Sequence, residues 1–81
     1  MKMKLVNSNH NYRLYVADDT KMKGGFYLGM REDLVHKKKD YCVVSYHEEL
    51  EAGKIVKKYR VNLIFNNILL MYQFYQQMRV R

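Results

Sequence analysis

The chain has 81 residues, of which 15 are Lys or Arg and 8 are Asp or Glu, giving a formal net charge of +7. This length suits one domain with one small core, and it excludes an enzyme built from separate cofactor and substrate domains. Hydrophobic residues make up 48% and charged residues 28%, which are ordinary globular values and exclude a disordered chain. The positive charge favours an anionic partner without identifying it.

The cysteine content and the hydropathy pattern bear on the compartment. Cys42 is the only cysteine, so the chain cannot form the intramolecular disulfides that stabilise most small secreted domains. The basic N-terminal segment, residues 1–13, contains no apolar stretch of the kind found in signal peptides. The longest apolar run, residues 68–72, is far shorter than the roughly 20 residues that cross a bilayer. We expect an intracellular, cytoplasmic protein in a reducing compartment, with no membrane partner.

The first part of the chain has the alternation of a β-hairpin followed by a third strand. Apolar and basic residues alternate over residues 1–5, and a second alternating segment covers residues 12–17. Between them, residues 7–11 are mostly Asn and Ser, which are typical of turns. A basic connector at 21–25 then leads to a strand over 26–30, which contains Gly29. A glycine inside a strand indicates a bulge or the close approach of another chain segment.

The middle of the chain predicts an exposed loop and a second hairpin. Residues 31–40 are largely polar and include three consecutive lysines, so we expect them to form a solvated loop. Residues 41–47 are mostly β-branched or aromatic and make the strongest strand signal in the chain. A turn at Ala52 and Gly53 separates this strand from a return strand over 55–61, which completes a three-stranded meander.

The last segment changes to a helical period. We expect a helix over residues 62–79, because no Gly or Pro interrupts this segment. Asn62 is its expected N-cap. Its main apolar stripe contains Ile64, Phe65, Ile68, Met71, Tyr72, Tyr75 and Met78. A second stripe of Leu63, Leu70 and Phe74 needs a cover of its own, and a second copy of the chain would provide it. This predicts a homodimer interface; alternatively, the sheet curls around both stripes.

These elements predict a single α+β domain over residues 1–81, with antiparallel strands in residues 1–61 and one C-terminal helix in residues 62–79. The strands form a hairpin plus a three-stranded meander. In element order the chain resembles the small SH3-like barrels of the chromodomain and of archaeal chromatin proteins. The resemblance implies a sheet that closes into a barrel, and it carries over no site residues.

Metal and catalytic sites have weak support. The nitrogen and sulfur ligands His10, His36, Cys42 and His47 lack the paired spacings of metal sites, so we expect no metal and no cofactor. A small ribonuclease needs a base, an acid and a cation, and His47, Glu48 and Arg31 are candidates for these roles. No spacing in the sequence requires them to meet. We therefore expect a protein that is not an enzyme.

Basic residues interleaved with aromatic residues predict a surface for an anionic partner. In such a surface, tyrosines stack on bases and lysines hold phosphates. The residues expected to bind nucleic acid or another anion are Lys2, Lys4, Arg13, Lys37, Lys38, Lys39, Lys57, Lys58 and Arg60. The pattern also has a purely structural explanation, because tyrosine is a favoured strand residue and lysines protect sheet edges.

Two functions follow from this surface. The first is a small, non-enzymatic, basic protein that contacts nucleic acid through its sheet and loops. The alternative is a small phage-type effector or inhibitor that binds an acidic host protein or a nucleoprotein complex. The small size, the second apolar stripe and the exposed basic loops favour the alternative as much as the first.

Overall fold

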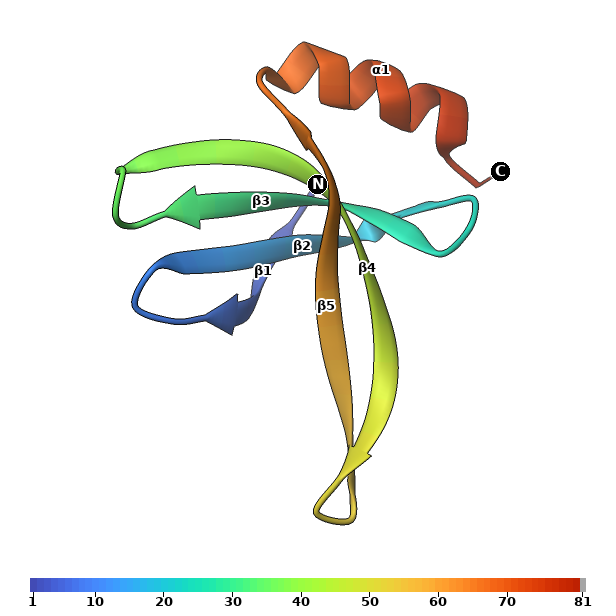
Figure 1. The fold of residues 1–81 in the computed structure, drawn as a ribbon. Coiled ribbons are helices and arrows are strands. Elements are labelled where there is room, and N and C mark those ends of the chain that lie inside the picture. The colour runs from blue at the N-terminus through green and yellow to red at the C-terminus, as the bar shows by residue number, and fades with distance from the viewer. Residues whose placement is uncertain (81) are drawn as a thin grey trace.

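The computed structural model describes residues 1–80, which form five antiparallel strands and one C-terminal helix (Figure 1). This confirms the predicted small α+β fold. The elements, in chain order, are β1 (Met3–Ser8), β2 (Tyr12–Met22), β3 (Phe26–Asp33), β4 (Lys38–Glu51), β5 (Lys54–Phe65) and α1 (Ile68–Met78). The expected loop at 31–40 is shorter than predicted, because β3 and β4 extend into it from both sides and pair Glu32 with Lys39.

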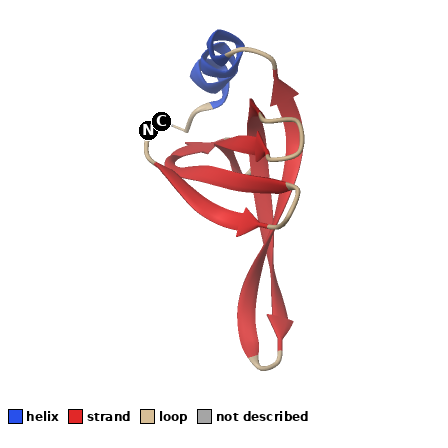
Figure 2. Ribbon diagram, turned by 90° about the vertical axis from the view of Figure 1, so that its left-hand side faces the viewer, coloured by secondary structure: helices blue, strands red, loops and turns tan. Residues whose placement is uncertain are grey.

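The strands form one sheet in the order β1-β2-β3-β4-β5, so every hydrogen-bonded neighbour is also the neighbour in sequence. The sheet curls into a half-barrel, as Figure 2 shows from the side. Within residues 1–80, β1 and β5 remain the two edges and are not paired with each other. The resemblance to SH3-like barrels therefore does not extend to closure of the barrel.

The curled sheet encloses one core on its concave face. Its buried residues are Leu14, Val16, Cys42 and Val44, and half-buried side chains from β1, β3 and β5 pack against them. Gly29 lies opposite Val16 and Cys42 in this region. A Cβ atom at Gly29 would lie 2.6 Å from the Tyr15 carbonyl oxygen and 2.7 Å from Val44 Cγ2. The expectation of a close backbone approach at Gly29 is confirmed, and any side chain at this position would collide with its neighbours.

A second core lies between the sheet and α1. Met71 of the helix is fully buried against Met22, Leu28 and Val43. The rings of Phe65 and Phe74 pack beside it with their centroids 5.6 Å apart. The register of β2 and β3 shifts between Ala17 and Met22. In this irregular segment the buried Thr20 hydroxyl provides hydrogen-bond partners for the backbone. It donates to the Ala17 carbonyl oxygen at 2.6 Å and accepts from the Leu28 amide at 2.9 Å.

The predicted start of the helix at Asn62 is wrong. Asn67 is the N-cap, and its side chain accepts from the amides of Leu69 and Leu70 at 2.7 and 3.3 Å. Residues 62–65 belong to β5, because pairing of Leu63–Phe65 with β4 outweighs their helical spacing. Asn62 instead occupies the register shift between the Val43–Leu63 and Val44–Val61 pairs, as a β-bulge. Among the described residues, no helix is both long and apolar enough to cross a membrane.

The distal half of β4 and β5 projects from the body as a two-stranded arm, seen at the bottom of Figure 1. We call residues 46–59 the arm, since β3 pairs with β4 only up to Val44. Its tip is a two-residue turn in which Ala52 and Gly53 have φ angles of 49° and 78°. The arm explains a radius of gyration of 13.1 Å, where a compact chain of this length has about 12 Å.

Candidate nucleic-acid interface

Three tyrosines gather on the concave side at the base of the arm. Tyr27 stacks on Tyr46 with ring centroids 6.1 Å apart, and Tyr46 packs on Tyr59 with centroids 5.6 Å apart. The ammonium of Lys57 lies 4.7 Å above the Tyr46 ring, a cation–π contact. Burial is the main cause that raises the pKa of Tyr27, and the neighbouring Tyr46 adds to it. The cluster presents aromatic surface beside a lysine.

A groove separates the two edge strands next to this cluster. It has a volume of about 300 Å³ and is lined by Val6, Asn7, Val56, Lys57, Lys58 and Tyr59. Its walls come from β1 and β5, which are the first and last strands of the chain and meet only because the sheet curls. Tyr59 belongs to both features, since it packs on Tyr46 and also lines the groove. The arrangement combines an aromatic face with ammonium groups from the wall.

The charges around the groove are mostly positive, although two lysines are paired. Lys4 contacts Asp18 at 2.8 Å and Lys58 contacts Glu51 at 2.8 Å, and each hydrogen bond raises the pKa of its lysine. Within residues 1–80, Lys57 forms no ion pair with a carboxylate, and neither do the predicted Lys2 and Arg60. Of these three cations only Lys57 lines the groove, where its ammonium lies over the Tyr46 ring and needs to displace no carboxylate to meet an anion.

The remaining predicted cations lie elsewhere. Lys37 lies in the turn between β3 and β4, and Lys38 and Lys39 are the first residues of β4. All three line a pocket of about 580 Å³ that is also lined by Glu32 and Asp33. Lys38 and Lys39 face these two acids across the strands. Arg13 on β2 contacts Glu32 at 3.4 Å. These four cations are therefore interleaved with acids, and they make a weaker anion site than the groove.

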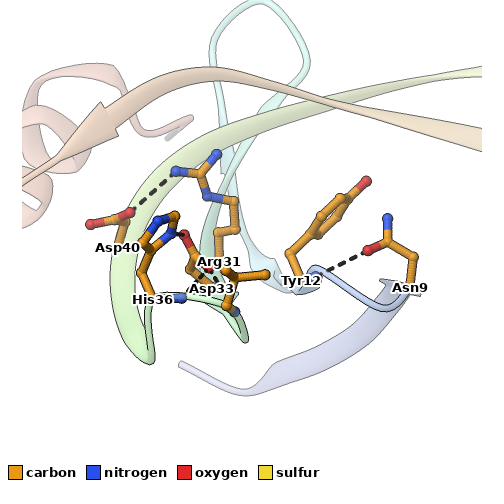
Figure 3. A network of polar contacts seen from close by, with 7 residues as sticks. Asn9, Tyr12, Arg31, Asp33, His36 and Asp40 are labelled. Carbon is orange, nitrogen blue, oxygen red and sulfur yellow. Dashed lines mark hydrogen bonds and ion pairs between the residues drawn. The ribbon is translucent and has the colours of Figure 1, made fainter.

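Figure 3 shows the polar contacts of this turn, between Asp33 and His36, together with those of the neighbouring β1–β2 turn and the Arg31–Asp40 pair. The Asp33 carboxylate accepts from the amides of Val35 and His36 and contacts His36 Nδ1 at 2.8 Å. These contacts with His36 are the main cause that lowers the pKa of Asp33 to about 2. The network holds the turn in place, where Lys37 has a φ angle of 55°.

The three residues considered for ribonuclease chemistry are not brought together. Arg31 contacts Asp40 at 3.2 Å near the start of β4. His47 lies seven residues further along the same strand, which corresponds to about 23 Å in extended backbone. His47 Nε2 instead contacts Glu49 at 2.8 Å on the exposed arm. The geometry therefore gives no shared site for a base and a cation from this set.

Cys42 and the histidines do not form a metal centre. Cys42 is fully buried in the concave core, and burial raises the pKa of its thiol to about 11. In the part of the chain that the structure describes, no three His, Cys, Asp or Glu side chains are grouped so as to hold a metal ion.

The apolar residues expected at a dimer interface are separated by the structure. Leu63 is on β5 rather than on the helix, and Phe74 faces the sheet and packs on Phe65, so the predicted helical stripe is wrong. Leu70 is on α1 and 48% exposed. Exposed apolar side chains occur along the segment where β5 leads into α1, with Leu63 and Ile64 on opposite faces of the strand. We call them the corner patch: Leu63, Ile64, Ile68, Leu69, Leu70 and Tyr72.

Sequence reasoning missed two features. The first is the strand pairing that builds the tyrosine cluster, and the second is a separate cluster of basic residues. Tyr46 and Tyr59 are equally distant from the turn at 52–53, so a two-residue hairpin turn alone predicts that they face each other. Lys23 and Arg79 line a pocket of about 470 Å³ at the C-terminal end of α1, where the chain bridges back to Met22. No local pattern connects Lys23 with Arg79, because their proximity depends on how the helix docks.

Comparison with models of protein families, with curated proteins and with solved structures finds no match to this chain.

Proposed function

We propose that the protein is a non-enzymatic, cytoplasmic binding protein that contacts nucleic acid along the groove between β1 and β5. The observation that supports this is the meeting of Tyr59, Lys57 and Lys58 with β1 at one groove. Lys57 is unpaired among the described residues, and Tyr59 lies at the end of a three-ring stack. Phosphates neutralise lysines and release counterions, while an aromatic face accepts any base.

A binding titration with charge-matched variants tests the proposal. Fluorescence anisotropy would follow a labelled oligonucleotide at about 50 and 200 mM salt, where phosphate contacts lose much of their affinity. Lys57→Gln with Lys58→Gln should weaken binding and flatten the dependence on salt. The control, Lys21→Gln with Lys23→Gln, removes the same charge at the other end of the molecule and should change affinity much less. Equal losses in the two double variants would show that only net charge matters.

We also propose that a second copy of the chain covers the corner patch. Residues 61–78 contain no charged side chain, so this is a surface on which two molecules of charge +7 can approach without opposing cations. The β5 edge beside Leu63 is open, because β5 pairs only with β4. An antiparallel pairing of two β5 edges centred on Leu63 would place Arg60 opposite Asn66 of the other copy. Arg60 would then lie away from the basic side chains of that copy.

Analytical ultracentrifugation tests the dimer. Leu70→Asp should shift a wild-type dimer to monomer, because an unpaired carboxylate would be buried in the interface. Leu50→Asp adds the same charge at the tip of the arm, where Leu50 is 75% exposed, and should leave the sedimentation unchanged. A wild-type chain that sediments as a monomer at about 100 µM would refute the proposal.

A protein partner remains the alternative function, and the arm favours it. Leu50 and Ile55 pair across the arm and are 75% and 71% exposed, an uncommon position for two aliphatic side chains. An effector or inhibitor that binds another protein through this tip would lose affinity with Leu50→Ser and Ile55→Ser, while nucleic-acid binding would be unaffected.

A further inference from the structure

We infer that the nucleic acid taken up at the groove is single-stranded and that one of its bases stacks against Tyr59. This inference rests on the proposed function and specifies its ligand. It rests on the unsuitability of α1 and of the arm, the two elements of this fold that could enter the major groove of a duplex, and on the residues that line the groove.

The helix is unsuited to reading a duplex. A recognition helix lies in the major groove between two phosphate backbones, which cationic side chains on or beside the helix neutralise. α1 contains no charged residue over Ile68–Met78, and its inner face is committed to the core through Met71. The outer side of its first turn is apolar, with Leu69 and Leu70 exposed, so insertion between phosphates would desolvate both partners without ion pairs.

The arm is also unsuited to a duplex. A two-stranded β-ribbon can enter a groove of DNA, but phosphates then flank both of its strands. The β5 strand of the arm is basic, whereas its β4 strand carries Glu48, Glu49 and Glu51. These three carboxylates would lie against one phosphate backbone. The asymmetry of charge leaves only the β5 side of the arm accessible to nucleic acid, which is the side that lines the groove.

The groove suits one unpaired base with its flanking phosphates. Tyr59 is half-buried, packs on Tyr46 and turns towards the groove, whose apolar lining also includes Val6 and Val56. Lys57 is on the same face of β5 as Tyr59, with its ammonium 4.7 Å from the centre of the Tyr46 ring, so it is within reach of a phosphate next to a stacked base. Lys58 also lines the groove but is on the opposite face of the strand, paired with Glu51. A base held in a duplex cannot present its face in this way, because its neighbours in the helix already cover both faces.

Fluorescence provides a direct test, because the chain contains no tryptophan. Tyr59→Trp introduces a single reporter, and we expect its fluorescence to be quenched on addition of oligo-dT, with little change on addition of the same mass of duplex. The wild-type protein should bind single-stranded oligo-dT at least about tenfold more tightly than the duplex at equal salt. Tyr59→Leu, which keeps an apolar side chain, should weaken single-strand binding about fivefold or more.

Three further measurements decide the result. Tyr15→Leu changes a half-buried tyrosine on β2, outside both the groove and the corner patch, and should leave affinity unchanged, and circular dichroism would confirm that both leucine variants are folded. Tyr59→Phe retains the ring and should bind like the wild type, whereas a loss equal to that of Tyr59→Leu would overturn the stacking contact. Equal affinity for single strand and duplex would overturn this inference and leave the proposed function standing. Absence of binding to both would overturn the proposed function itself.

Discussion

Gly29→Ala is the substitution that most directly probes the curl of the sheet. The new methyl carbon would lie 2.6 Å from the Tyr15 carbonyl oxygen and 2.7 Å from Val44 Cγ2, and both distances are well inside the roughly 3.5 Å at which heavy atoms attract. Val44 can adjust in part, but the Tyr15 carbonyl belongs to β2 in the interior of the sheet. Overpacking costs about 1–3 kcal/mol, and the backbone contact puts this site in the upper half of that range.

Urea denaturation monitored by circular dichroism would measure the loss. A cost of about 2–3 kcal/mol is a large part of the roughly 4–12 kcal/mol expected for 81 residues, and it should lower Tm by about 10–20 °C. Gly25→Ala is the control, because nothing lies within 4 Å of its added Cβ; its cost reflects only the φ of 80° and should be about 1 kcal/mol. A Gly29→Ala variant within about 0.5 kcal/mol of the wild type would refute the packing argument.

Three other substitutions test local features. Asn67→Ala removes the side chain that caps α1 and should cost about 1 kcal/mol in urea denaturation, whereas Asn67→Ser should retain most of the stability. Ala52→Gly relieves a φ of 49° at the tip of the arm and should stabilise the protein by about 0.5–1 kcal/mol; a destabilised variant would mean that the turn is not strained. Because the folded-state pKa of Asp33 is lowered to about 2, its contribution to stability is present above about pH 4 and is lost as pH falls towards 2. Asp33→Asn should lack this part of the acid-induced loss, and identical pH profiles for variant and wild type would contradict the assignment.

The order of the strands was accessible from the sequence, because alternation and turn residues act locally. The hairpin turn at Ala52–Gly53 even fixes the pairing of Tyr46 with Tyr59. The helix boundary was not accessible in this way. Leu63–Phe65 have both the spacing expected of a helix and the propensity of a strand. Their pairing with β4, across the bulge at Asn62, makes them part of strand β5.

The groove depends on effects that act at long range. Lys4 and Lys57 are far apart in sequence, and their strands approach only because the sheet curls around Gly29 and around the register shifts. A single sequence indicates that Gly29 is unusual without indicating which strand approaches it. The division of the predicted binding residues between the groove and the β3–β4 turn therefore required the folded chain, and their role in binding stays a prediction.

The central claim is that nucleic acid contacts the groove between β1 and β5, and an NMR titration tests it most directly. Amide shifts of the ¹⁵N-labelled protein would be recorded while oligo-dT is added at low salt. We expect the largest changes at Val6, Asn7 and residues 56–59, with small changes at Lys37–Lys39. Shifts confined to the β3–β4 turn, or no shifts at all at millimolar oligonucleotide, would contradict the account.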